Sequence, residues 1–405
     1  MSSLGRFSAR RLAVIGSAVA LGTGVASVGL LSAGVTPARA APSCAGTTTV
    51  TCTFSTVGTD TFTVPAGVSQ VTIDAKGAEG GGGNFGVPGG KGAQVQASFS
   101  VTAAEVLNVV VGGMGSSVAS AGGGGGGSFV YTSATAAGLL IAAAGGGGAR
   151  ATGVGIDGSA TTTASDGQSG GGTGGAAGTG GSGGAGGSGV PATGAGGGGL
   201  LTDGGNGSSP PAGTGAIRGM ALANGSAGGS GQDSDVGGGH GGFGGGGGAA
   251  SAGGGGGGGY NGGGGGAGGG AAGGGGGSFF AASATNTSGT SGANTGNGQV
   301  TISYTQPLAV SVYSLTARRS QRGVVVRWHT GSEADTLGFN VYRMQGHRRV
   351  RLNRRLLPAL GGVSGRSYSF LDRRAPRHRA SRYWLQDVSR SGIRTWHGPV
   401  RVAAA

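Results

Sequence analysis

Runs of glycine constrain this fold more than any other feature of the sequence. Of the 107 glycines in 405 residues, 92 lie between residues 41 and 306, many of them in unbroken runs such as 122–127 and 253–259. Glycine destabilises a helix interior by about 1 kcal/mol per residue and adds no side chain to a core. The block therefore excludes a helical bundle and a continuous aliphatic core. It also excludes collagen, because the chain has only 11 prolines and its glycines are clustered.

The chain divides into three segments of different charge. Residues 1–40 hold four arginines and no acidic residue, residues 41–306 carry a net charge of −5, and residues 307–405 carry +15 from nineteen arginines and four acidic residues. Arginine outnumbers lysine 25 to 2, which, with so much glycine and alanine, suggests a GC-rich bacterial genome. The sequence predicts a leader, a weakly acidic glycine-rich block and a compact basic module.

The first segment, residues 1–40, predicts an export signal. Arginines near the start precede an uncharged stretch from residue 12 to residue 36, and the small-residue site Ala38-Arg39-Ala40 follows. We expect cleavage between Ala40 and Ala41, and hence a secreted or cell-surface protein. The uncharged stretch is also long enough for an uncleaved membrane anchor. The arginine pair in the leader leaves both general secretion and twin-arginine export open.

The only two cysteines, Cys44 and Cys52, lie just beyond the expected cleavage site. In an exported chain we expect them to form one disulfide within the N-terminal segment, residues 41–54. A loop of this length stabilises a fold by about 2–3 kcal/mol. A zinc site is disfavoured, because zinc takes four ligands and no histidine lies near the pair in the sequence. We expect neither a metal nor a cofactor.

Strand-forming sequence surrounds the glycine runs. Alternating, β-branched segments are typical of strands, and they span residues 71–75, 94–101, 106–111, 128–131, 138–144 and 298–304. Glycine tracts framed by strands on both sides predict a domain over residues 55–305. Within it, segment 158–235 is richer in serine, threonine and aspartate, and we expect it to be looped or disordered.

The order of these signatures resembles a known family. The similarity is to the glycine-rich domain of the anaplastic lymphoma kinase and leukocyte tyrosine kinase receptors, which also occurs in bacterial exported proteins. It is carried by Phe62-Thr63-Val64-Pro65-Ala66-Gly67-Val68, the run 80–83, Val109-Val110-Val111-Gly112-Gly113, the run 122–127 before Ser128-Phe129-Val130, Leu139-Leu140-Ile141 and Gly298-Gln299-Val300. The resemblance implies a β-sheet frame carrying a lattice of polyglycine-II helices. It implies no kinase, because the kinase sequence elements are absent.

Helices of the polyproline-II type have three residues per turn and no internal hydrogen bonds. Because glycine lacks a Cβ, several such helices can pack side by side and bond N–H to C=O between neighbours. Residues that would mark where the lattice meets the frame or solvent are Val236, Phe243, Tyr260, Phe279 and Phe280. The alternative is a flexible glycine-serine linker, and the sequence leaves both open.

The composition changes at residues 306–309, the expected linker to a second domain over 310–403. Six short strands separated by turns predict a small antiparallel β-sandwich, and they span 310–315, 324–329, 338–343, 368–371, 383–388 and 399–402. Trp328-His329-Thr330-Gly331 and Gly338-Phe339-Asn340-Val341 resemble a fibronectin type III-like module of bacterial exported proteins. The resemblance implies that Trp328, Phe339 and Tyr383 are core or corner residues. The predicted fold class is all-β throughout.

We expect no catalytic residue in the basic module. Glu333 and Asp335 form a carboxylate pair, but no nucleophile elbow, zinc helix or paired-acid signature accompanies them. We expect the two acids to lie in an inter-strand turn, where they bond backbone or pair with arginines. The candidate bases, which we expect to be solvated, are His329, His347, His378 and His397.

Two arginine clusters are the candidate binding residues, because guanidinium groups bind phosphate and carboxylate through paired hydrogen bonds. One contains Arg348, Arg349, Arg351, Arg354 and Arg355, and the other Arg373, Arg374, Arg377, Arg379 and Arg382. Candidate partners are an anionic envelope polymer, anionic lipid or extracellular nucleic acid, although the chain has no specific nucleic-acid motif. That the arginines only solvate the surface is equally open.

These features predict a secreted or cell-surface, non-enzymatic structural or adhesive protein of a bacterial envelope or matrix. The alternative is a ligand-recognition module that binds a polysaccharide or a protein and shares the same fold. A third possibility, an extracellular enzyme, lacks any convergent site in the sequence.

Overall fold

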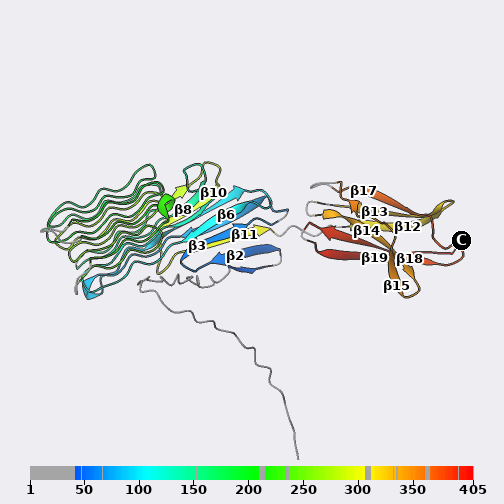
Figure 1. Cartoon of the computed structure of the whole chain (residues 1–405), viewed down its shortest axis with the longest axis horizontal. Coiled ribbons are helices and arrows are strands. Elements are labelled where there is room, and N and C mark those ends of the chain that lie inside the picture. The colour runs from blue at the N-terminus through cyan, green and yellow to red at the C-terminus, as the bar shows by residue number, and fades with distance from the viewer. Residues whose placement is uncertain are drawn as a thin grey trace, which may run out of the picture. The chain divides into compact units, whose positions relative to one another are not determined.

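The computed structural model describes residues 42–404, except 47, 66, 152, 209–214, 233–236, 306–311, 332, 334–335, 361–364 and 391. Their regular structure consists of β-strands and two single-turn 3-10 segments, with no α-helix in the described ranges (Figure 1). The all-β prediction is therefore confirmed. The predicted signal, its cleavage site at Ala40 and Ala41, and the linker 306–309 lie outside the described residues.

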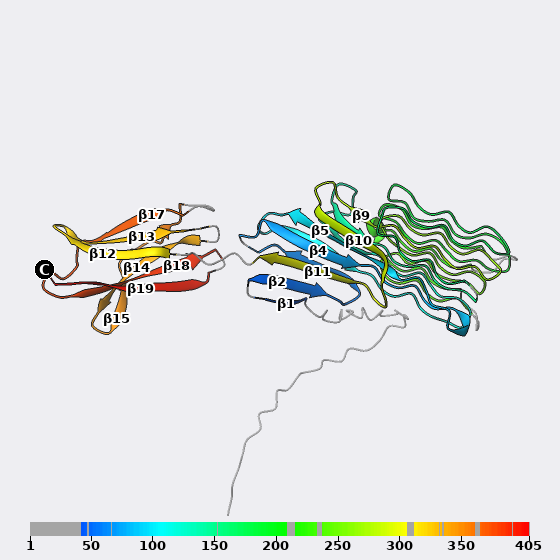
Figure 2. The ribbon, with the colours of Figure 1, turned by 180° about the vertical axis from the view of Figure 1, so that it is seen from behind.

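One sheet of the glycine-rich domain has six antiparallel strands (Figure 2). In spatial order they are β1 (Ser43–Ala45), β2 (Thr49–Phe54), β11 (Gln299–Thr305), β4 (Gln70–Lys76), β5 (Gly92–Ser100) and β10 (Thr285–Asn294). The last strand of the domain, β11, lies between β2 and β4, so the end of the domain pairs with its beginning. Cys44 of β1 pairs with Cys52 of β2 and forms the predicted disulfide.

The second sheet has five antiparallel strands and shares a core with the first. Its strands are β3 (Gly58–Thr63), β6 (Val106–Val111), β7 (Ser128–Tyr131), β8 (Leu139–Ala143) and β9 (Phe279–Phe280). Ile73 and Phe99 from one sheet pack in the same cluster as Leu107 and Ile141 from the other, all of them buried. Burying a side chain of this size contributes about 1.5–3 kcal/mol, so the strand frame has an ordinary apolar core.

The described residues of the glycine-rich stretches 77–91, 112–127 and 144–278 are here called the glycine array. They run back and forth as extended segments side by side (Figure 1). Successive N–H groups of residues 254–259 donate to three different neighbouring segments, over N···O distances of 2.9–3.3 Å. The donor pairs and their acceptors are Gly254 and Gly257 to Ala271 and Gly274, Gly255 and Gly258 to Gly122 and Gly125, and Gly256 and Gly259 to Ala195 and Gly198. Donors three residues apart therefore reach the same neighbour, three residues further along.

A second segment of the array, residues 122–127, repeats this pattern with neighbours that run in the opposite direction. Its donor pairs and acceptors are Gly122 and Gly125 to Ala149 and Gly146, Gly123 and Gly126 to Ser116 and Gly113, and Gly124 and Gly127 to Gly247 and Gly244. The bonding thus has a period of three residues, whereas a β-strand has a period of two. Each of the two segments donates to three neighbouring segments and accepts hydrogen bonds from three others.

The close approach of these backbones explains the composition. A Cβ at Gly124 would lie 2.0 Å from the carbonyl oxygen of Gly256, and a Cβ at Gly146 would lie 1.9 Å from that of Gly90. Real Cβ atoms essentially never come within 3.0 Å of such a neighbour. Any other residue would therefore push the segments apart and break the hydrogen bonds between them.

The array meets the outer face of the five-stranded sheet through apolar side chains. Leu200 and Leu222 of the array pack with Phe129 and Leu139 of the sheet. Of the residues expected to mark such boundaries, Phe243, Tyr260 and Phe279 join this cluster and Phe280 packs against the other core. Tyr260 and Phe279 stack with ring centroids 4.5 Å apart. Val236 lies outside the described residues.

Segment 158–235 differs from its expectation of loop or disorder. Outside 209–214 and 233–236, its residues bond into the array: Gly194 donates to Gly266 and Gly197 to Gly263, both at 2.9 Å. Its polar side chains bond to the backbone instead of disrupting it. The fully buried Thr193 donates its hydroxyl hydrogen to the Gly187 carbonyl at 2.7 Å.

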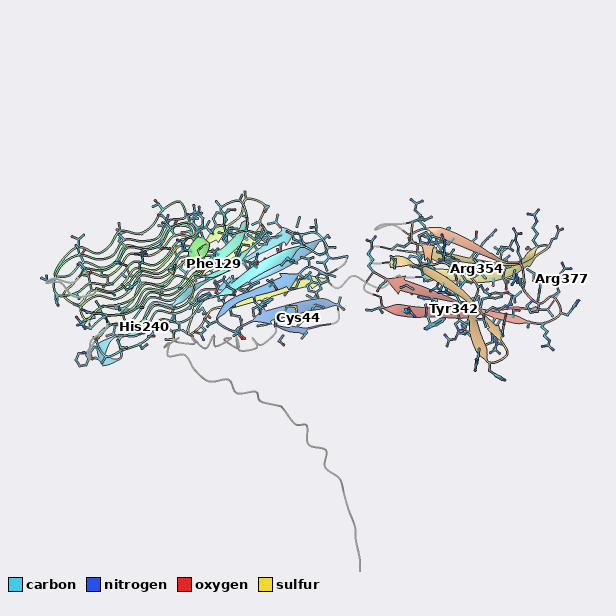
Figure 3. The ribbon with its side chains drawn as sticks, viewed as in Figure 1. Cys44, Phe129, His240, Tyr342, Arg354 and Arg377 are labelled. Atoms are coloured by element: carbon cyan, nitrogen blue, oxygen red, sulfur yellow. A yellow bond between two sulfur atoms is a disulfide. The ribbon has the colours of Figure 1, made fainter. Side chains whose placement is uncertain are left out.

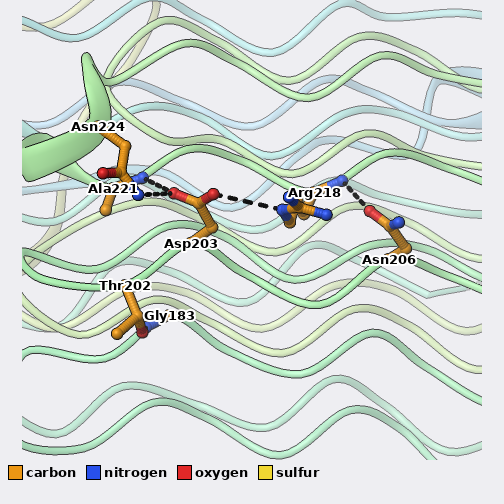
Figure 4. Close-up of polar contacts among 7 residues, drawn as sticks. All are labelled: Gly183, Thr202, Asp203, Asn206, Arg218, Ala221 and Asn224. Atoms are coloured by element: carbon orange, nitrogen blue, oxygen red, sulfur yellow. Dashed lines mark hydrogen bonds and ion pairs between the residues drawn. The ribbon is translucent and has the colours of Figure 1, made fainter.

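Asp203 shows the same use of a polar side chain (Figure 4). Its carboxylate accepts hydrogen bonds from the Ala221 N–H at 2.9 Å, the Asn224 amide at 2.8 Å and the Arg218 guanidinium at 3.4 Å. Burial alone would raise the pKa of Asp203, but these donors outweigh burial and lower the pKa below its ordinary value. The ionised carboxylate therefore ties its own segment to the segment that carries Arg218, Ala221 and Asn224.

The C-terminal domain has two antiparallel sheets around one core, an arrangement that fits the predicted β-sandwich. One sheet contains β12 (Val312–Ser320), β13 (Gly323–Thr330) and β17 (Ser367–Asp372), and the other contains β15 (Arg348–Arg351), β14 (Thr336–Gln345), β18 (Ser381–Ser389) and β19 (Arg394–Val402), with β16 (Leu357–Pro358) beside β14. Trp328, Phe339 and Tyr383 lie in this core. The Trp328 ring contacts that of Phe339 edge-on, with centroids 5.5 Å apart.

Candidate functional site

Side chains are sparse inside the glycine array and dense over the C-terminal domain, where many arginines project into solvent (Figure 3). All ten arginines of the two sequence clusters are exposed. Four of them line one pocket of about 380 Å³: Arg351 and Arg354 from the first cluster, and Arg373 and Arg374 from the second. We call it the arginine pocket.

A buried ion pair joins the two sheets at this pocket. Arg343 of β14 pairs through Nη1 with Asp372 Oδ2 at the end of β17, and both residues line the pocket. They are only 5% and 4% exposed. The first cluster begins on β15, which pairs with β14, and Arg373 and Arg374 of the second follow β17. The ion pair between β14 and β17 therefore brings the two clusters together.

The carboxylate of Asp372 has further donors. The Tyr383 hydroxyl donates to Oδ2 at 2.9 Å, and the Arg374 N–H donates to Oδ1 at 3.0 Å. Burial first, and then the hydrogen bond to Asp372, raise the pKa of Tyr383 well above its ordinary value, so the hydroxyl stays protonated and donates. Within the described part of the chain, Arg343 Nε is buried and has no hydrogen-bond partner.

The charge of the pocket favours an anion. Five arginines line it against one acidic residue, Asp372, whose charge is balanced by Arg343. The exposed guanidinium groups of Arg351, Arg354, Arg373 and Arg374 therefore carry an excess of positive charge. Each of them can bind phosphate or carboxylate through two parallel hydrogen bonds.

A second pocket of about 210 Å³ shares Arg373 with the first, and Arg319, Arg322 and Arg377 also line it. Arg319 donates to three carbonyl oxygens, those of Ala403 and Pro376 at 2.8 Å and that of Arg379 at 3.0 Å. It therefore holds the loop after β17 against the end of the domain. Arg322, Arg373 and Arg377 are exposed around this anchor.

No protein-family model matches this chain, and no curated protein matches it. The resemblances to a glycine-rich receptor domain and to fibronectin type III modules therefore depend on the quoted motifs. Function has to be argued from the geometry of the arginine pockets. No helix in the described residues is long and apolar enough to cross a membrane.

The other candidate arginines line neither pocket; they are Arg348, Arg349, Arg355, Arg379 and Arg382. Arg349 has a different contact. Its guanidinium carbon lies 4.3 Å from the ring centroid of Trp396 and 5.3 Å from that of Trp384. A cation–π contact of this kind holds the guanidinium against the outer face of the sheet.

Sequence reasoning missed three arginines that line the pockets: Arg319, Arg322 and Arg343. Arg343 could have been found, because it alternates with Phe339 and Val341 along the predicted strand and so faces the core. Arg319 and Arg322 gave no such signal. They lie around a hairpin turn, where exposed arginines are ordinary.

Glu333, one of the two carboxylates considered for catalysis, has a structural role. Glu333 is only 1% exposed and accepts hydrogen bonds from the Tyr368 hydroxyl at 2.6 Å and from the Thr330 hydroxyl. It therefore links two strand ends within the domain, whereas Asp335 lies outside the described residues.

The candidate bases are dispersed over the domain. His329 contacts Ser367 at 3.0 Å, His397 contacts Asp387 at 2.7 Å, and His347 and His378 are exposed. Across the described residues, no group of three or more His, Cys, Asp or Glu side chains is placed to hold a metal ion.

Proposed function

We propose that this is a secreted or cell-surface, non-enzymatic structural or adhesive protein of a bacterial envelope or matrix. In this proposal the glycine-rich domain is a rigid body, and the basic domain attaches it to an anionic polymer. The observation that carries the proposal is the arginine pocket, where Arg351, Arg354, Arg373 and Arg374 converge from two separate sequence clusters.

We infer that the glycine array is a lattice of polyglycine-II helices. The three-residue period of its hydrogen bonds matches the three residues per turn of that helix. The resemblance to the glycine-rich domain of the anaplastic lymphoma kinase and leukocyte tyrosine kinase receptors points the same way. A lattice whose segments donate to and accept from several neighbours suits a structural role, because it bends less freely than a linker.

Two observations support the rest of the proposal. The Cys44–Cys52 disulfide suits an oxidising compartment outside the cytosol, as the predicted export signal requires. The resemblance of the basic domain to fibronectin type III-like modules suits a binding role. Glu333 and His397, considered above as a catalytic acid and base, are engaged in contacts within the domain. The arginine pocket supplies binding groups and no paired acid and base.

The test is salt-dependent retention of the full-length protein on a phosphate-rich cell-wall fraction. We expect retention at low salt and release at about 1 M salt, where the Debye length falls to about 3 Å. Replacing the four pocket arginines Arg351, Arg354, Arg373 and Arg374 by glutamine should abolish retention. A matched variant with four exposed arginines outside both pockets, Arg318, Arg327, Arg390 and Arg394, has the same net charge and should stay bound.

Equal loss in the two variants would show that net charge alone acts, and it would contradict a role for the pocket. Retention that does not change with salt would contradict binding to an anionic polymer altogether.

A further inference from the structure

We propose that the two arginine pockets are adjacent subsites for one linear polyanion whose phosphate groups repeat along the chain, such as a polyphosphate or a polyol phosphate. The inference rests on the proposed function and names the ligand class. Its geometric basis is Arg373, which lines both pockets. A ligand with several phosphates can fill both subsites across this residue, whereas a single phosphate fills one.

Both subsites are rich in donors and poor in acceptors. The first presents Arg351, Arg354 and Arg374 beside the shared arginine, and the second presents Arg322 and Arg377. The one carboxylate, Asp372, is already bonded to Arg343, Tyr383 and the Arg374 backbone. An anion entering the first subsite therefore meets guanidinium groups and little exposed negative charge.

Arg343 is an independent sign of a ligand site. It lines the first subsite, is 95% buried, and its Nε has no hydrogen-bond partner among the described atoms. A buried, charged N–H that bonds to nothing is costly, and native structures rarely leave one unsatisfied. A small shift of the Arg343 side chain toward the subsite would let a phosphate oxygen supply the acceptor.

The lining favours a ligand recognised by its phosphates alone. Phe370 is the one aromatic residue among the described residues that line the two pockets, and it packs against the core of the domain. Proteins that bind single-stranded nucleic acid stack the bases on aromatic rings. The ring of Phe370 is half-buried and is the one ring that the described lining offers, so a polymer without bases fits the pockets better.

The experiment compares chain lengths by calorimetry on the full-length protein. Polyphosphate of about ten phosphates should bind at least about tenfold more tightly than pyrophosphate, because the second subsite is then filled intramolecularly. Replacing Arg322 and Arg377 by alanine removes two guanidinium groups of the second pocket only. This variant should bind pyrophosphate within about twofold of the original and lose the advantage of the longer chain, and its salt slope for polyphosphate should fall by about 2.

A matched control replaces Arg318 and Arg390, which lie outside both pockets and are exposed. It should keep the dependence on chain length. Equal affinity for pyrophosphate and polyphosphate in the unaltered protein would overturn the inference, as would equal losses in the two variants. Tighter binding of single-stranded DNA with the same number of phosphates would also overturn it.

These outcomes separate the inference from the proposed function. Salt-dependent retention on the cell-wall fraction without a dependence on phosphate chain length would support the proposed function and contradict the two-subsite ligand. Loss of retention would remove both.

Discussion

The glycine array and the C-terminal domain satisfy their backbones in opposite ways. In the array, one segment such as 254–259 donates to three neighbours and accepts from three others, and these contacts are backbone against backbone. In the C-terminal domain, strands pair only in sheets, and side chains such as Trp328 and Phe339 fill the space between them. Side chains therefore matter differently in the two regions. Packing in the array requires their absence, whereas packing in the C-terminal core requires that they fit together.

The most damaging change should be Asp372→Ala in the C-terminal domain. It leaves Arg343 buried without its carboxylate partner, and loss of one member of a buried pair costs about 3–5 kcal/mol. Tryptophan fluorescence during urea unfolding measures this selectively, because all three tryptophans lie in this domain. The free energy of unfolding should fall there, while protection of the glycine array from hydrogen exchange should not change.

The control for this variant is the double substitution Arg343→Met with Asp372→Leu. A buried pair can be exchanged for apolar residues at little cost, so the double variant should recover much of the lost stability. If Asp372→Ala costs less than about 1 kcal/mol, the ion pair does not hold the two sheets together.

The matching change in the array is Gly124→Ala, which should cost about 3 kcal/mol or more. The new Cβ would lie 2.0 Å from a backbone oxygen, and backbone on three sides cannot move as a core side chain can. Hydrogen exchange of residues 122–127 should speed up, while the tryptophan signal of the C-terminal domain should stay as it was.

Gly180→Ala separates crowding from backbone strain. A Cβ there meets nothing within 4 Å, but φ is +62°, so the cost should be about 1 kcal/mol. Equal effects of Gly124→Ala and Gly180→Ala would mean that the close approach of neighbouring segments is unimportant.

The same contrast explains which elements the sequence could predict. Strands with alternating apolar residues were found with their bounds, since β6 (Val106–Val111) and β7 (Ser128–Tyr131) coincide with the predicted segments. β10 (Thr285–Asn294) was missed, because its mostly exposed polar residues carry no alternation. β11 pairs with β2 and β4, which lie more than 200 positions earlier in the chain. A local sequence pattern cannot predict such a pairing.

The candidate site was predictable in its chemistry and less so in its geometry. Composition identified the arginine clusters, but only the fold selects Arg351, Arg354, Arg373 and Arg374 from the ten candidates. That selection depends on Arg343 and Asp372, which lie 29 positions apart. Likewise, local sequence could not show that the polar segment 158–235 belongs to the array, because its bonding partners lie far along the chain.

Reducing the Cys44–Cys52 disulfide should cost about 2–3 kcal/mol, less than Asp372→Ala or Gly124→Ala, as expected for cysteines eight positions apart. The bond holds β1, the edge strand of the six-stranded sheet. The Cys44→Ala, Cys52→Ala variant should therefore lose amide protection in β1 and β2 and keep it in the array. Loss of amide protection throughout the array would contradict the claim that the disulfide stabilises only this edge of the sheet.

Loss of the Asp203 carboxylate should have an effect as small as that of Gly180→Ala, about 1 kcal/mol for the hydrogen bonds it accepts. Its folded pKa is lowered, so its stabilisation is present above its unfolded pKa of about 4. It is lost as pH falls through the lowered folded pKa. Melting curves between pH 5 and pH 2 should show a larger loss of stability in the original protein than in Asp203→Asn. An identical pH dependence in the two proteins would show that the Asp203 carboxylate does not contribute to stability.

Site-resolved hydrogen exchange of the glycine amides tests the central claim most directly. If the array is bonded with a period of three residues, every amide in 122–127 and 254–259 has a partner, and all twelve should exchange at least about a thousandfold more slowly than in an unfolded chain. A flexible linker would give all of them the exchange rates of unfolded chain, and an edge strand of a β-sheet would protect only alternate amides. Either result would contradict the account.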